Sequence, residues 1–133
     1  MKKHFRWTAI AVLLFGVVFT ISGCDTLYQK GYDTGLKHWK TESFDNVYQR
    51  ETRIYHDSRI ALTPEQETVL RQIKQDEWDK IQVMIAEEEA GRMTGAEVMK
   101  QAIEEARASD KRLKPHLTEK QLATLKSLGH GIE

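Results

Sequence analysis

The chain has 133 residues, which is enough for one small domain. Its single cysteine, Cys24, excludes a disulfide framework and a thiolate metal cluster. The formal charge of zero is unevenly distributed, because three of the 20 basic residues and none of the 20 acidic residues precede Cys24. The 17 basic and 20 acidic residues that remain make the rest of the chain mildly acidic, whereas a nucleic-acid partner requires a basic surface. We therefore expect no nucleic acid among the partners.

The first 24 residues have the plan of a secretory signal. Lys2, Lys3 and Arg6 form a positive start, and a nearly unbroken apolar run follows at 7–21. That run is shorter than the roughly 20 residues that a bilayer span needs. The Ser-Gly-Cys ending resembles the lipobox of bacterial lipoproteins, although an isoleucine stands where that motif usually has leucine. The resemblance implies cleavage before Cys24 and lipidation of its thiol; the alternative is an uncleaved membrane anchor with an incidental cysteine.

The sequence predicts three parts: a cleaved signal peptide at 1–23, an anchor and juxtamembrane segment at 24–42, and a small helical domain at 43–133. A lipidated cysteine would attach the chain firmly, since each buried CH₂ adds roughly 0.8 kcal/mol. Asp25, directly after that cysteine, resembles the signal that keeps enterobacterial lipoproteins in the inner membrane. We therefore expect a chain that faces the periplasm from the inner membrane. The alternatives are that Asp25 only begins a solvated linker and that the anchor lies in the outer membrane.

Aromatic residues are concentrated at 28–55, which holds six of the seven aromatic residues after the predicted cleavage site. Their spacing in the second half of this stretch predicts a helix at about 43–58. We expect Tyr32, Trp39 and Tyr48 to bind a protein partner, because Tyr and Trp are enriched at binding hot spots. Trp39 stands off the helical stripe and is the residue expected to be an exposed contact. The alternatives are that these rings form an ordinary core or lie at the membrane headgroup level.

Three helix starts share one motif, the capping box. In this motif a threonine hydroxyl accepts a hydrogen bond from the backbone three residues later, and the Glu or Gln at that position bonds back to the threonine N–H. The three predicted boxes pair Thr63 with Gln66, Thr94 with Glu97, and Thr118 with Gln121. Three such boxes specify the starts of three helices.

Apolar residues at three- and four-residue spacing predict two long helices, at about 63–91 and 94–115, and a short final helix at 119–128. We expect Ile103 on the packed face of the second long helix. Glu77 interrupts the apolar face of the first, and since burial of a carboxylate is costly, we expect it at a rim or paired with an arginine. The alternating pattern of strands does not occur. The expected fold is all-α: a signal helix followed by three or four helices, with a long antiparallel helical hairpin and a short C-terminal helix.

The chain contains few candidates for chemistry. His56 and His116 each precede a capping box and are the candidates for a metal site, if the fold brings them close to a carboxylate. The alternative is that both are solvated or capping residues. No metal-binding histidine pair, nucleophile elbow or phosphate-binding loop is present in the sequence. We therefore expect no enzymatic activity, no cofactor and no resident metal.

A further resemblance lies in two of the capping boxes, since LTPEQ at 62–66 and LTEKQ at 117–121 both read L-T-x-x-Q. This pair resembles the motifs of the Spy/CpxP family of bacterial envelope proteins over about residues 60–128. The resemblance implies an all-helical periplasmic protein that acts as an ATP-independent chaperone, a stress regulator or a metal sensor. The lipid anchor, the mild acidity, the shorter interval between the motifs and the lack of histidine-rich tracts depart from that family.

The sequence thus predicts a membrane-anchored lipoprotein that binds protein, as a Spy/CpxP-like chaperone of unfolded clients or an envelope-stress sensor. A chaperone of this kind should expose a concave apolar face. Two alternatives stay open: an accessory or exclusion-type subunit of an envelope membrane complex, and a metal sensor that uses His56 or His116. The oligomeric state is left open, with a dimer among the options.

Overall fold

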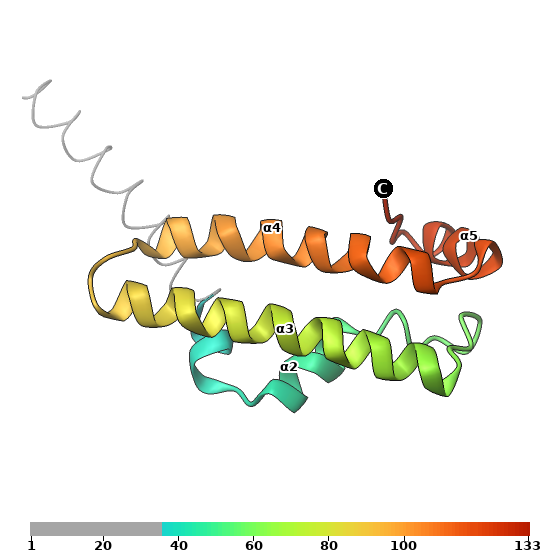
Figure 1. Cartoon of the computed structure of the whole chain (residues 1–133), viewed down its shortest axis with the longest axis horizontal. Helices are drawn as coiled ribbons and strands as arrows, with labels where there is room; N and C mark the ends of the chain where they lie inside the picture. Colours follow the sequence, from blue (N-terminus) through green and yellow to red (C-terminus); the bar gives the residue numbers. More distant parts are fainter. Residues whose placement is uncertain (1–35) are drawn as a thin grey trace, which may run out of the picture.

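The computed structural model describes residues 36–133, and all regular structure in this part of the chain is helical (Figure 1). The prediction of an all-α fold is confirmed. The elements are a helical stretch at 36–41, α2 (Phe44–Glu51), α3 (Pro64–Glu89), α4 (Gly95–Leu113), a 3₁₀ turn (Lys114–His116) and α5 (Glu119–Ser127). None of these helices is both long and apolar enough to cross a membrane. The predicted signal peptide, Cys24, Asp25 and Tyr32 lie outside the described residues.

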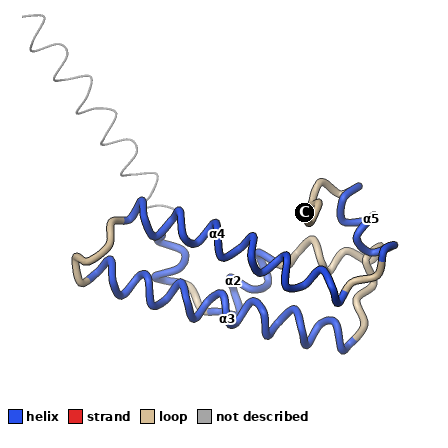
Figure 2. Tube along the Cα trace, turned by 45° about the horizontal axis from the view of Figure 1, so that its top comes forward, coloured by secondary structure: helices blue, strands red, loops and turns tan. Residues whose placement is uncertain are grey.

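The helices α3 and α4 form the predicted long antiparallel hairpin (Figures 1 and 2). With 26 residues, α3 is about 40 Å long. The segment 36–62 lies along one side of the hairpin, and α5 lies at its open end, opposite the loop that joins α3 to α4. The hairpin is therefore the frame on which the shorter elements pack.

The apolar core consists of two clusters spaced along the hairpin. The cluster at the open end contains Tyr48, Tyr55, Ile60, Leu70, Ile73, Leu113, Leu117 and Leu125. The cluster near the α3–α4 loop contains Leu36, Ile81, Ile85, Val98 and Ala102. Because Leu36 is only 1% exposed, the packed domain begins before residue 43, where the sequence placed its boundary.

All three predicted capping boxes are confirmed. Each threonine hydroxyl accepts from the backbone N–H three residues later, and each Glu or Gln side chain accepts from the threonine N–H. At the start of α3 these two bonds measure 3.2 Å and 2.9 Å. Each box satisfies two backbone donors that the first turn of a helix otherwise leaves unpaired.

The predicted helix at 43–58 is wrong in its second half, because α2 ends at Glu51 and turns follow it. The Thr52 hydroxyl donates to the backbone carbonyl of Tyr48 at 2.6 Å, and the Thr52 N–H bonds to the same carbonyl at 2.9 Å. A threonine that bonds locally in this way competes with continuation of the helix. The turns bring the chain back to the open end of the hairpin, where α3 begins.

The hairpin loop ends α3 where the sequence predicts, since Gly91 takes a φ of 74°, in the left-handed region that favours glycine. The expectation for Ile103 is wrong, because its side chain is 50% exposed. The small residue Ala102, beside it on α4, is the one that is buried against the hairpin core. An apolar stripe predicts a face only to within about one residue, and here the alanine packs and the isoleucine does not.

We predict that Thr63→Ala, Thr94→Ala and Thr118→Ala each lower the free energy of unfolding by roughly 0.5–2 kcal/mol, because each removes one N-cap. Chemical denaturation of the purified chain in detergent measures the loss. Ser58→Ala is the control, since this exposed serine lies outside the helices. Losses no larger than that of the control at all three threonines would show that the caps do not stabilise the fold.

Candidate functional site

The two L-T-x-x-Q motifs meet in space through their glutamines, although Gln66 and Gln121 are 55 residues apart. Gln66 Nε2 donates to Gln121 Oε1 at 2.8 Å, and Gln121 Nε2 donates to Gln66 Oε1 at 2.9 Å. The two amides thus form a closed, reciprocal pair. Sequence reasoning identified both glutamines as caps but not as partners of one another.

The same amides also bind the backbone on both sides. Gln66 Nε2 donates to the carbonyl of His116 at 2.8 Å, and Gln121 Nε2 donates to the carbonyl of Ile60 at 3.2 Å. Each Oε1 accepts in addition from the N–H of its own capping threonine, at 2.9 Å in both boxes. A glutamine amide offers two donor hydrogens and two acceptor lone pairs, so every hydrogen-bonding position of both amides is used. The pair therefore joins the start of α3, the start of α5 and the two segments that precede them.

Three of the four Phe, Trp and Tyr residues of 36–62 pack together with one residue of α3 and form the aromatic cluster (Trp39, Phe44, Tyr48 and Trp78). Trp39 stacks on Trp78 with ring centroids 5.7 Å apart, and Phe44 meets Trp78 edge-on at 6.1 Å. The guanidinium of Arg71 lies 5.2 Å from the centre of the Phe44 ring and 5.0 Å from that of Tyr48. This combination of ring–ring and cation–π contacts fixes the start of the described chain on α3.

Because of these contacts, the predicted binding residues Tyr48 and Trp39 are less exposed than the sequence analysis expects. Tyr48 is 8% exposed and belongs to the core, as the alternative view of the sequence allowed. Trp39 is half-buried against Trp78 and the core, so the expectation that it stands alone as an exposed contact is wrong. Part of the Trp39 ring stays accessible, together with part of Phe44.

The two histidines that the sequence singles out do not meet at a carboxylate cluster. His56 Nε2 lies 2.9 Å from Glu67 Oε1, and its ring packs edge-on against Tyr48. His116 lies exposed in the 3₁₀ turn, where its backbone carbonyl accepts from Gln66. Within residues 36–133 no group of three or more His, Cys, Asp or Glu side chains is arranged to hold a metal ion.

A buried ion pair lies inside the hairpin. Lys74 Nζ donates to Glu77 Oε2 at 2.8 Å, and the two side chains are 9% and 1% exposed. The expectation of a rim position or an arginine partner for Glu77 is wrong: the partner is a lysine one turn earlier on the same helix. The other oxygen, Glu77 Oε1, is buried and has no hydrogen-bond partner among residues 36–133. Removing one member of such a pair leaves an uncompensated buried charge, which costs about 3–5 kcal/mol.

A second polar group joins the turn segment, α4 and the C-terminal tail. The Tyr55 hydroxyl donates to Asp110 Oδ1 at 2.7 Å and lies 2.9 Å from His130 Nε2. Burial, with the hydrogen bond to Asp110 as the next cause, raises the pKa of Tyr55 above its ordinary value. The tyrosine therefore stays protonated and acts as a hydrogen-bond donor that holds these three elements together.

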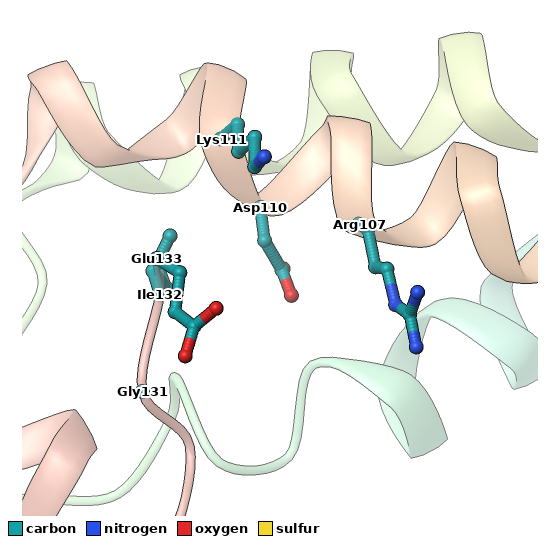
Figure 3. A pocket seen from close by; sticks show the side chains of 6 residues that line it. All are labelled: Arg107, Asp110, Lys111, Gly131, Ile132 and Glu133. Atoms are coloured by element: carbon teal, nitrogen blue, oxygen red, sulfur yellow. The ribbon is translucent and has the colours of Figure 1, made fainter.

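A surface hollow of about 480 Å³ lies beside this group, between α4 and the C-terminal tail (Figure 3). Its lining residues are Arg107, Asp110, Lys111, Gly131, Ile132 and Glu133. The Asp110 carboxylate points into the hollow, and both charge signs occur on its walls. Because its lining residues carry both charges, the hollow does not favour a ligand of one particular charge.

We predict strong coupling between the two glutamines in a double-mutant cycle. Gln66→Ala and Gln121→Ala should each lower the free energy of unfolding by about 1–3 kcal/mol, because each leaves the other amide, buried in Gln121 and half-buried in Gln66, without its partner. The loss in the double variant should be smaller than the sum of the two single losses by at least about 0.5 kcal/mol.

Glu97→Ala provides the matched control, because Glu97 closes a capping box with Thr94 alone. The loss of unfolding free energy in Glu97→Ala should add to the loss in Gln66→Ala to within about 0.5 kcal/mol. Simple additivity of the two glutamine variants would contradict a closed amide pair.

The described part of the chain thus contains the Gln66–Gln121 amide pair at the open end of the hairpin, the aromatic cluster, and the buried ion pair of Lys74 and Glu77. Its large exposed apolar side chains are Val83 and Ile103, 64% and 50% exposed. Val83 lies on α3 and Ile103 on α4. No protein-family model, curated protein or solved structure matches the chain.

Proposed function

We propose that this chain is a lipid-anchored envelope protein that faces the periplasm from the inner membrane and binds another protein. The signal-like first 24 residues and their Ser-Gly-Cys ending support lipidation at Cys24. Asp25, directly after it, is the proposed sorting residue. The domain that would present the binding surface is the helical hairpin with its packed N-terminal segment.

One observation supports the likeness to Spy/CpxP proteins: the glutamines of the two L-T-x-x-Q motifs bind each other. A capping box needs only the threonine and the glutamine of its own helix start. The reciprocal bonds between Gln66 and Gln121 go beyond that requirement. A capping box is satisfied by either Glu or Gln at this position. Only an amide, which offers donor hydrogens as well as acceptor lone pairs, can form the reciprocal pair.

The exposed surface favours a defined partner over unfolded clients. A chaperone that holds unfolded chains needs a wide apolar face. In residues 36–133 the large exposed apolar side chains are Val83, on α3, and Ile103, on α4. The accessory-subunit alternative therefore fits the described surface better, and the chaperone or stress sensor is the second candidate because of the motif resemblance. His56 is already paired with Glu67, which does not favour metal sensing.

We place the contact on the accessible part of the aromatic cluster, around Trp39 and Phe44. Both rings are half-buried and held rigidly by Trp78, so little conformational entropy is lost when a partner covers them. Aromatic residues that are fixed in this way are enriched at binding hot spots.

We predict that Cys24→Ser abolishes lipid attachment and leaves an unprocessed precursor, because the thiol is the only atom in the chain that a lipobox lipidates. Labelling cells with a clickable fatty acid and comparing the two chains on a gel gives the answer. Equal label on the wild type and on Cys24→Ser would refute the anchor.

We predict that crosslinking in intact cells, followed by mass spectrometry, captures one stoichiometric partner, and that Trp39→Ala reduces this capture at least about tenfold. Val83→Ala is the control, because it removes an exposed apolar group outside the aromatic cluster. Circular dichroism and thermal unfolding of both variants establish that they remain folded. A spread of clients without a dominant partner would support the chaperone instead, and unchanged capture by folded Trp39→Ala would exclude this contact surface.

A further inference from the structure

The core cluster near the α3–α4 loop, here called the loop-end cluster, has a rim that consists mostly of methionine. Four half-buried side chains pack against its buried residues: Trp39, Met84, Met93 and Met99. Within residues 36–133 these are the only methionines, and the cluster at the open end of the hairpin contains none. The sulfur atoms of the described chain are therefore confined to one end of the hairpin.

The three methionines reach the loop-end cluster from three consecutive parts of the chain. Met84 lies on α3, Met93 in the loop, and Met99 on α4. Met93 directly precedes the N-cap of α4, and Val98 is the fourth residue of that helix, so the two occupy the positions of a hydrophobic staple. Val98 is 0% exposed. The methionines thus help to hold α3, the loop and the start of α4 together.

The same methionines are accessible to small solutes. Each of them is half-buried, so part of its side chain meets solvent. Met84 also lines a surface hollow of about 360 Å³, whose other lining residues are polar and come from α4: Glu97, Lys100, Gln101, Glu104 and Glu105. A hollow with polar walls admits a small polar oxidant such as hydrogen peroxide.

We propose that Met84, Met93 and Met99 form a reversible oxidation site, at which a peroxide converts the thioethers to sulfoxides and thereby loosens the loop end of the hairpin. In this reaction the sulfur lone pair attacks one peroxide oxygen, and an S–O bond forms as the O–O bond breaks. After a proton shift the second oxygen leaves as water. Sulfur is oxidised by two electrons, and the peroxide is reduced by the same two. This inference concerns the fold and does not rest on the proposed function.

The loosening follows from the polarity of the sulfoxide. A methionine that stays packed after oxidation buries a new hydrogen-bond acceptor among apolar side chains, which is unfavourable. A methionine that turns to solvent instead gives up its contacts with the cluster, so either outcome weakens the packing. The stretch 36–41 is affected as well, because Leu36, only 1% exposed, and Trp39 pack in the same cluster.

Amide hydrogen exchange of the full chain in detergent, before and after treatment with hydrogen peroxide, tests this site. Peptide mass spectrometry should find one added oxygen on each of the three methionines. The protection of the amides at 98–103 on α4 should then fall at least about tenfold, while that of the amides at 68–74, at the open end of α3, falls much less. Incubation with methionine sulfoxide reductases for both sulfoxide epimers should restore the protection.

The matched control is the triple variant Met84→Leu, Met93→Leu and Met99→Leu. Leucine keeps the volume and the apolar character of methionine but has no sulfur to oxidise. The variant still contains Cys24 and the aromatic residues, so any effect of their oxidation appears in both chains. Its α4 protection should not change with peroxide.

Four results would overturn the proposal. The first is the absence of sulfoxide at these methionines under conditions that oxidise an unstructured methionine peptide completely. The second is complete oxidation with unchanged α4 protection. The third is an equal fall in the wild type and in the triple leucine variant, which would assign the effect to another group. The fourth is a loss of protection that the reductases do not reverse; this measurement uses the wild type alone and decides the question even if the leucine variant does not fold.

Discussion

The reciprocal hydrogen bonds between Gln66 and Gln121 are the constraint that holds the open end of the helical hairpin together. A helical hairpin has one covalent loop and one open end, and α3 and α4 are joined covalently only at the loop around Gly91. At the open end the two amides bind each other and the carbonyls of Ile60 and His116. The turn before α3 and the turn before α5 are thereby held together, and the apolar cluster beneath them is closed.

The middle of the hairpin follows a different principle, since it contains charge where an apolar stripe would be expected. The buried pair of Lys74 and Glu77 contributes little net stability, because desolvation offsets most of the Coulombic attraction. It lies on α3 between Ile73 of one apolar cluster and Ile81 of the other. This small domain thus combines an open end that the amide pair holds together with a buried ion pair in the middle of the hairpin.

Local signals in the sequence were sufficient for the helix starts and for the hairpin. Thr63, Thr94 and Thr118 cap as predicted because a capping box involves only four consecutive residues. Features that depend on distant residues were not predictable. The partner of Gln66 is 55 residues away, and nothing local distinguishes a capping glutamine that pairs from one that does not. The burial of Glu77 was missed for a related reason: its i,i+3 spacing from Lys74 is common on exposed helices as well.

The most direct test of this account is solution NMR of the side-chain amides of Gln66 and Gln121 in the full chain. The amide pair predicts nuclear Overhauser effects between the two NH₂ groups and slow exchange of their protons with water, because both groups are fully hydrogen-bonded. It also predicts that Gln121→Ala shifts the Gln66 side-chain resonances toward those of a free glutamine. Rapidly exchanging amide protons with no contact between the two side chains would contradict it.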